Sequence, residues 1–201
     1  MPRRNKWVQT TMNARRYTHL AISLHWLVAI AILINVTLAL TWEYYPDDAV
    51  RPAINFHKSL GITVLGLAIM RLLWRLTHTP PPLPTAYQKW EILLSHATHI
   101  ALYALIFAMP LSGWIMDSAW EKAAENPMSL FGLFEWPRIG FIMALDPATK
   151  KTVHDVFGET HEIAAYFVFV LVALHVLGAL KHQFFDKKRE LQRMWFTGRT
   201  E

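Results

Sequence analysis

The chain has 201 residues, of which 53% are hydrophobic and only 17% are charged, with a formal net charge of +5. Soluble domains carry about a quarter of their residues as charged side chains, so this composition favours a membrane protein, in a single domain covering residues 1–201. The absence of cysteine excludes disulfides, thiolate zinc sites, iron–sulfur clusters and covalent c-type haem attachment.

Four apolar runs reach the length of about twenty residues that a helix needs to cross a bilayer. They cover residues 20–42, 54–76, 92–116 and 162–185. The first run is too long for a removable signal peptide and lacks a small-residue cleavage site. The chain is therefore predicted to be an all-α membrane protein, a bundle of four transmembrane helices.

The basic residues predict the orientation of this bundle. The amino-terminal arm, the second connection and the carboxyl tail hold fourteen cations and four acids, a net charge of +10, whereas the other side holds six cations and eleven acids, a net charge of −5. The positive-inside rule then places both termini in the cytoplasm of a bacterial inner membrane. A soluble nucleic-acid-binding protein is not expected, because the cations flank apolar spans instead of gathering on one amphipathic surface.

The connections between the runs differ in length and character. Residues 77–85, THTPPPLPT, predict a stiff extended connector, because proline cannot continue a helix. The connection of residues 117–159 is long and contains the apolar stretch SLFGLFEWPRIGFIMAL, which Gly132, Pro137 and Gly140 interrupt. This pattern predicts a periplasmic lid on the membrane surface, not a fifth span.

The stretch HEIAAYFVFVLVALH, residues 161–175, overlaps the fourth run and begins and ends with a histidine, His161 and His175. Fourteen helical positions rise about 21 Å and return to within about 40° of the starting direction, so both imidazoles share one helix face at two depths. The first run carries His25 near its cytoplasmic end, and the second carries His57 near its periplasmic end. Matching depths predicts two pairs, His25 with His175 and His57 with His161.

Two facing imidazoles suit a planar iron macrocycle with two open axial positions, and the interior of a helix bundle is a usual place for one. Ionisable residues inside a membrane are costly and usually face the bundle interior, which favours this hypothesis over histidines held by hydrogen bonds alone. The four side chains therefore predict two b-type haems stacked across the membrane.

The other histidines leave alternatives open. His154 is an alternative to His161 as the outer ligand, but its distance from His175 would span nearly the whole hydrocarbon thickness, about 31 Å. His96 and His99 are expected to bond a haem propionate or to lie at the interface. His19 and His78 are expected at the interface with no special role.

Several motifs together resemble the bacterial cytochrome b561 family of inner-membrane di-haem cytochromes, which includes superoxide:ubiquinone oxidoreductase. They are SLHW in the first run, HKSLG and RLLWR in the second, SHATHIALYALIFAMPLSG in the third, and HEIAAYFVFVLVALH followed by ALKH in the fourth. The resemblance implies two haem b groups with bis-histidine ligation, and ubiquinone near the cytoplasmic haem.

Helix geometry points to the residues near that quinone. His182 lies seven positions beyond His175, about 20° away in direction and about 10 Å nearer the cytoplasm. An imidazole and the hydroxyl of Ser23 there would suit a quinone carbonyl, the alternative for His182 being an interfacial side chain. Arg71 is expected to pair with a propionate of the inner haem, or alternatively with a lipid phosphate.

The predicted function is electron transfer from a periplasmic one-electron donor, which the resemblance implies is superoxide, to ubiquinone. Two haems hold the two electrons that a quinone accepts. Cations near the outer haem would steer a small anion. The candidates are Lys58, Arg138, Lys150 and Lys151. The net charge of −5 on that side means that such steering has to be local.

Two other functions stay open. The first is a haem-b anchor subunit fed by a periplasmic dehydrogenase or hydrogenase, which would dock on the aromatic side chains of the long connection, Trp120, Phe131, Phe134 and Trp136. The second is a non-haem transporter that binds a divalent metal through its histidines.

Overall fold

A computed structural model describes residues 16–82, 87–188 and 190–196 of the chain. The cations at positions 3, 4, 6, 15, 189 and 199, which contribute to the predicted orientation, lie outside the described residues, as does the end of the proline-rich connector. Within the described residues the fold is helical, apart from one two-stranded hairpin.

Four long helices form the body of the molecule: α2 (His19–Thr41), α3 (Asp47–Thr77), α4 (Lys89–Ser118) and α6 (Pro147–Leu180). A five-residue π-helix, η2 (Lys181–Phe185), continues α6, and a short 3₁₀ turn, η1 (Trp42–Tyr44), follows α2. All four helices are long and apolar enough to cross a membrane. The predicted fold class, an all-α bundle of four spans, is confirmed.

Helix α6 begins fifteen residues earlier than expected. Asp146 caps its first turn, accepting hydrogen bonds from the backbone N–H groups of Ala148 and Thr149, and Pro147 occupies the first helical position, where a missing N–H costs nothing. The helix also runs through Gly158 without interruption. The long connection is therefore shorter than the predicted range of residues 117–159.

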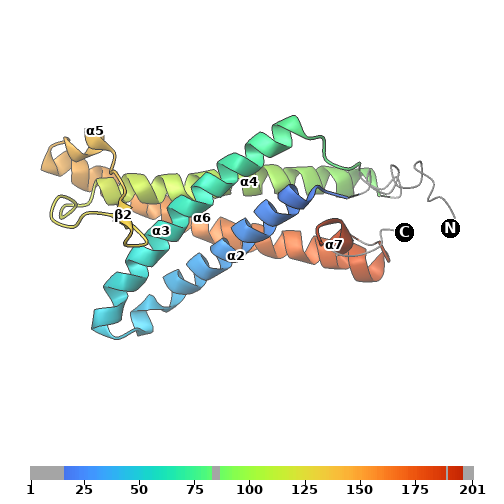
Figure 1. Cartoon of the computed structure of the whole chain (residues 1–201), viewed down its shortest axis with the longest axis horizontal. Helices are drawn as coiled ribbons and strands as arrows, with labels where there is room; N and C mark the ends of the chain where they lie inside the picture. Colours follow the sequence, from blue (N-terminus) through green and yellow to red (C-terminus); the bar gives the residue numbers. More distant parts are fainter. Residues whose placement is uncertain (1–15, 83–86, 189, 197–201) are drawn as a thin grey trace, which may run out of the picture.

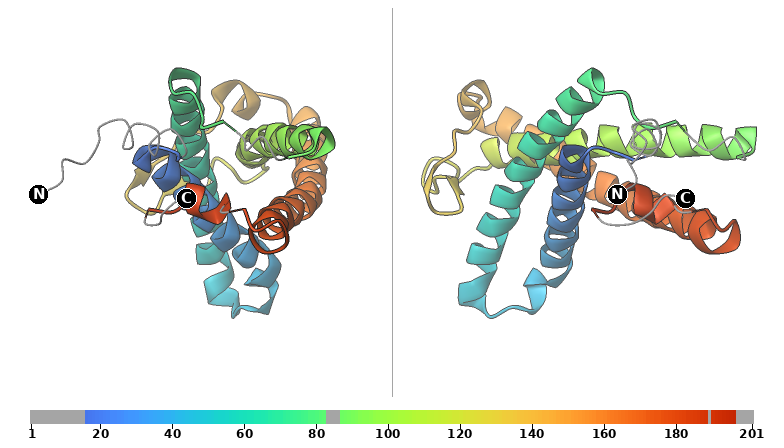
Figure 2. Two further views of the ribbon diagram at one scale, coloured as in Figure 1. Left: turned by 90° about the vertical axis from the view of Figure 1, so that its right-hand side faces the viewer. Right: turned by 45° about the vertical axis from the view of Figure 1, so that its right-hand side comes forward.

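The helices pack as two pairs that cross. Helix α4 lies along α6, and α2 lies along α3, which in turn contacts α4. The α2–α3 pair runs diagonally across the α4–α6 pair, so the two pairs diverge (Figures 1 and 2). The buried cluster of small and branched side chains, Val28, Ala31 and Val64, lies between α2 and α3, and Ile106 of α4 packs against it. Small side chains allow helix backbones to approach closely, as membrane helices require.

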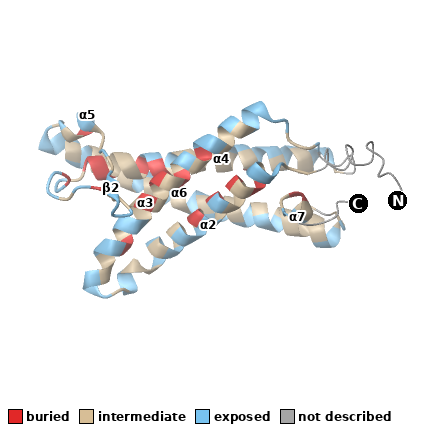
Figure 3. Ribbon diagram, viewed as in Figure 1, coloured by how far each residue is buried: buried red, intermediate tan, exposed pale blue. Residues whose placement is uncertain are grey.

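Most of the helix surface is exposed or half-buried, and the buried positions lie where helices pack on one another and where the connection at the loop end folds against them (Figure 3). The exposed side chains include many leucines, isoleucines and phenylalanines along the spans. In water such a surface would be unfavourable, whereas lipid tails cover it without cost.

The bundle has two distinct ends. The end where α2 and α4 begin and η2 finishes is called the basic end, because its described residues include Arg16, Lys89, Lys181, Lys187 and Lys188. The opposite end, where α4 finishes and α6 begins, is called the loop end and carries residues 119–146. At the basic end Arg193 of α7 (Glu190–Arg193) donates hydrogen bonds to the carbonyls of Pro81 and Pro82 and so holds the proline-rich connector.

The connection at the loop end contains a hairpin of β1 (Ser129–Leu130) and β2 (Phe134–Glu135), followed by α5 (Gly140–Met143). Its tight turn uses positive φ angles at Phe131 (52°) and Gly132 (72°). The buried hydroxyl of Ser59 on α3 donates to the carbonyl of Ser129 and accepts from the N–H of Phe131. As predicted, this apolar stretch is not a fifth span among the described residues, and Ser59 docks it on α3.

Candidate functional site

His57 on α3 and His161 on α6 face each other in the half of the bundle nearer the loop end. Their ring centroids are 6.2 Å apart and the ring planes make an angle of 68°. Each ring places Nδ1 against a backbone carbonyl, of Asn35 at 3.2 Å and of Met109 at 3.0 Å respectively. A carbonyl only accepts, so Nδ1 carries the proton in both rings and the lone pair of Nε2 is available to a metal.

The neighbours of His161 explain its close approach to α4. A Cβ added at Gly113 would lie 3.3 Å from Cε1 of His161, so glycine makes room for the ring. The hydroxyl of the neighbouring Ser112 lies 3.0 Å from Nδ1 of His161 and donates to the Met109 carbonyl. The orientation of the ring is thus set by α4.

His25 on α2 and His175 on α6 form a second pair with the same centroid separation, 6.2 Å, at a plane angle of 71°. His99 on α4 adds a third ring, whose centroid is 5.2 Å from that of His175. His99 was expected at a haem propionate or at the interface, and it lies directly against this inner pair. Spacing along one helix could not reveal this contact, because it depends on how α4 rotates against α6.

Arg71 on α3 lies beside the inner pair, at the level expected from the sequence. Its Nη1 donates to Nδ1 of His25 at 2.7 Å, and its Nε donates to the hydroxyl of Tyr103 at 3.0 Å. An arginine only donates, so Nδ1 of His25 accepts here and the proton of the neutral ring lies on Nε2. The inner and outer pairs therefore have opposite tautomers at the α2 and α3 histidines.

Both pairs fit an axially ligated metal in a planar macrocycle. Imidazole nitrogens bind a transition metal at about 2 Å, and the ring centre lies about 1 Å further back, so two axial imidazoles have centroids about 6 Å apart. The observed 6.2 Å matches this value in both pairs. At the inner pair, ligation through Nε2 additionally requires that Arg71 release Nδ1 of His25.

The predicted steering cations separate into two groups. Lys58 and Arg138 both bind the buried carboxylate of Asp117, at 2.5 and 2.9 Å. Lys151 instead pairs with the exposed Asp155 at the start of α6, beside Lys150 in the chain. Only the first group lies near the outer histidine pair.

A cavity of about 190 Å³ adjoins Lys58 and Arg138 and is also lined by Arg51, Asn55 and Trp120. The guanidinium of Arg51 lies 5.0 Å from the ring centre of Trp120, and the ammonium of Lys58 lies 5.7 Å from it. Arg51 and Asp117 were not predicted from the sequence, because only the folded connection brings them close to Lys58 and Arg138.

At the basic end, His182 contacts Asp186 through Nδ1 and Oδ2 at 2.6 Å, and its ring packs on Tyr87 with centroids 4.4 Å apart. Ser23, the other quinone candidate, is half-buried on α2. The described residues contain no hydrogen bond between Ser23 and His182.

The other histidines lie outside both pairs. His154 contacts the neighbouring Asp155 at 3.5 Å, and His161, not His154, faces His57. His78 stacks on Trp74, His19 meets Phe196 edge-on, and His96 is exposed.

Four apolar helices with paired histidines between them define a membrane-embedded cytochrome. The chain belongs to the prokaryotic cytochrome b561 family, whose pattern matches residues 16–197. This membership, in a family that binds haem, replaces the alternative of a non-haem metal transporter.

Three curated relatives cover nearly the whole chain. Cytochrome b561 homolog 2 of Escherichia coli (strain K12) is 37% identical over 92% of this chain and 93% of its own length. Probable superoxide oxidase CybB of Yersinia pestis is 25% identical over 90% of this chain and 96% of its own length. Cytochrome b561 homolog 1 of Escherichia coli (strain K12) is 23% identical, with coverage of 89% and 96%.

Proposed function

We propose that the chain carries electrons across the bacterial inner membrane through two b-type haems, from superoxide at the loop end to ubiquinone at the basic end. The observation that carries the proposal is that the two histidine pairs have the same ring-centroid separation, 6.2 Å. Their members on α6, His161 and His175, lie fourteen residues apart. The proposed axial ligands are His57 and His161 for the outer haem, and His25 and His175 for the inner haem.

When bound, each haem supplies an iron that accepts and donates one electron at a time. The protein fixes which nitrogen of each histidine ligand carries the proton. The carbonyls of Asn35 and Met109 keep the proton on Nδ1 of the outer histidines and make Nε2 the stronger ligand. At the inner pair Arg71 would pair with an anionic haem propionate in place of His25, because a guanidinium binds a carboxylate more strongly than a neutral imidazole.

The cavity beside Lys58 is the proposed entry for superoxide. Arg51, Lys58 and Arg138 line it with three positive charges, while Glu125 and the buried Asp117 supply two negative ones, so the local excess is positive although this side of the chain is net negative. Local positive potential raises the encounter rate of a small anion. Two superoxide ions give up one electron each and leave as dioxygen, and one quinone takes both electrons and two protons.

The first experiment counts haem per chain from the dithionite-reduced spectrum and then mixes the oxidised protein with superoxide, with and without ubiquinone. We expect two b haems that superoxide reduces rapidly and quinone reoxidises. Arg51→Gln should slow the superoxide step, with a weaker dependence on ionic strength, whereas Lys151→Gln, a cation paired outside the cavity, should not. If the protein holds two haems that superoxide does not reduce, superoxide is refuted as the donor.

A partner-fed anchor subunit remains the second candidate, because the loop end exposes large apolar side chains. Leu133, Phe134 and Phe141 are 80%, 53% and 75% exposed. Aromatic and apolar side chains in such a position suit docking of an electron-donating protein. Slow reduction by superoxide, together with rapid reduction by a bound periplasmic dehydrogenase or hydrogenase, would favour this candidate.

A further inference from the structure

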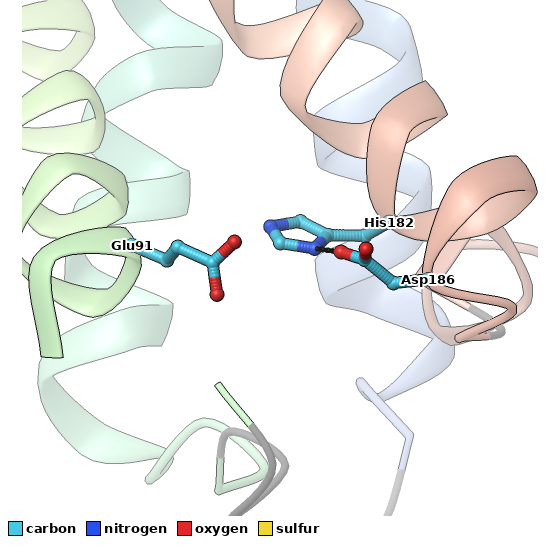
Figure 4. A group of neighbouring side chains, drawn as sticks. All are labelled: Glu91, His182 and Asp186. Carbon is cyan, nitrogen blue, oxygen red and sulfur yellow. Dashed lines mark hydrogen bonds and ion pairs between the residues drawn. The ribbon is translucent and has the colours of Figure 1, made fainter. Parts of the chain in front are cut away.

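A compact group of charged side chains surrounds His182 at the basic end. Figure 4 shows the imidazole between two carboxylates, Glu91 from α4 on one side and Asp186, just beyond η2, on the other. Atoms of these three side chains that could each bind a proton or a metal lie within 4.8 Å of one another. Helices far apart in the sequence thus deliver two carboxylates to one ring.

Lys181 joins the two carboxylates. Its ammonium donates to Oε1 of Glu91 and, at 3.0 Å, to Oδ2 of Asp186. Asp186 also holds Nδ1 of His182 at 2.6 Å, and these contacts with Lys181 and His182 lower the pKa of Asp186 below its usual value. Asp186 is therefore ionised near neutral pH, and a carboxylate in this position orients the imidazole of His182.

The remaining groups that face His182 close one side of the ring. Tyr87 packs against the imidazole and donates its hydroxyl to Glu190 at 2.6 Å, and Glu190 in turn binds Arg193. Burial, and then the hydrogen bond to Glu190, raise the pKa of Tyr87, so its hydroxyl stays protonated. Tyr87 is a wall of the site and not a source of protons.

The cluster is better suited to protons than to a metal ion. The ammonium of Lys181 already lies between the two carboxylates, where a metal would have to bind. Glu91, Asp186 and Lys181 together carry a net charge of −1, and a protonated His182 brings the cluster to zero. An exchangeable proton on the imidazole thus completes the charge balance of the cluster.

The position of His182 links this cluster to the inner histidine pair. His182 follows His175 by seven residues, about 10 Å along the helix axis and on nearly the same face. The last turn is a π-helix, a form that is frequent at functional sites, and it is followed directly by Asp186.

We propose that Glu91, Lys181, His182 and Asp186 form the proton-supply site for quinone reduction, an inference that rests on the proposed function. His182 donates a proton to a quinone oxygen, and water at the basic end replaces it by way of the two carboxylates. Two such transfers, with two electrons delivered one at a time from the inner haem site, convert both C=O groups to C–OH. His182 is the catalytic acid, and Asp186, Glu91 and Lys181 are positioning residues.

The test follows reoxidation of the reduced holoprotein by a short-chain ubiquinone in a stopped-flow spectrometer between pH 6 and 9. Asp186→Asn should slow reoxidation at least roughly tenfold above pH 7, less at pH 6, and added imidazole or formate should restore much of the rate. Haem content and reduction by superoxide should be unchanged. Asp155→Asn is the matched control, because Asp155 also has a basic partner four residues away but lies at the other end.

Two further variants keep the test decisive. Asp186→Glu should retain most of the rate. Glu91→Gln replaces Asp186→Asn in the test if Asp186→Asn loses haem or fails to fold, and it should show the pH dependence predicted for Asp186→Asn. A slowing that is equal at every pH and is not rescued by small acids would mean a merely structural role and overturn the proposal. Wild-type rates of reoxidation in both Asp186→Asn and Glu91→Gln would also overturn the proton-supply site, but would leave the proposed quinone reduction intact. If quinone does not reoxidise the wild-type protein at all, both the proton-supply site and the proposed function are overturned.

Discussion

The outer and inner histidine pairs have the same ring separation but different surroundings. The outer rings are held by neutral backbone carbonyls of α2 and α4, whereas the inner rings contact a guanidinium and a third imidazole. The outer pair already has the tautomers that metal ligation requires, and the inner pair must release Arg71 first. Equal geometry in the two halves of a bundle therefore does not imply equal electrostatics.

The different surroundings should give the two sites different reduction potentials. A positive charge near a haem favours its reduced form, so Arg71 should raise the potential of the inner site relative to the outer one. Electrons would then move from the loop end to the basic end, in the direction of the proposed quinone.

The largest effect is expected from removing one proposed axial ligand. We expect His161→Ala to lower the haem content from two to one per chain, because the outer iron loses an axial imidazole, while His154→Ala keeps both. Quantifying haem b against protein in the purified variants measures this. Loss of a haem in His154→Ala would mean that the outer pair is wrongly assigned.

The buried ion cluster beside the outer pair should matter for stability. Asp117→Asn leaves the cations of Lys58 and Arg138 without their carboxylate, and breaking a buried pair in this way costs about 3 kcal/mol. The midpoint of denaturant unfolding in detergent should fall clearly. The exposed pair of Lys151 and Asp155 is the comparison, and Asp155→Asn should change the midpoint little.

The electrostatic difference itself is tested at the inner pair. Arg71→Gln should retain both haems but lower the inner potential by on the order of 50 mV, about 1.2 kcal/mol for one electron, because a cation near the iron is lost. A redox titration followed in the haem α-band would resolve the two sites. An unchanged inner potential would remove Arg71 as the cause of the asymmetry.

The smallest effect is expected at the outer pair. Ser112→Ala removes one hydroxyl near Nδ1 of His161, but the carbonyl of Met109 still accepts the proton. The outer potential should shift by less than about 20 mV, with no loss of haem, as is usual for a redundant neutral hydrogen bond. A larger shift in the same redox titration would show that the hydroxyl, not the carbonyl, holds the ring.

Much of this protein could be predicted from local patterns. Long apolar runs predict spanning helices because lipid offers no partner to backbone polar groups, and the regular rise and rotation of a helix put His161 and His175 on one face. The start of α6 was missed, since the polar residues that open it do not look like a span even though Asp146 and Pro147 signal a helix start.

The sequence by itself determined the fold class, the family resemblance and the depth of each histidine along its own helix. Only the tertiary structure decided which side chains from other helices meet these rings: His99 and Arg71 at the inner pair, the Met109 carbonyl at the outer pair, and Glu91 beside His182. The reason is physical. Helical periodicity acts within one helix, whereas contacts between helices depend on crossing and rotation, which are decided by the packing of small side chains across the whole bundle.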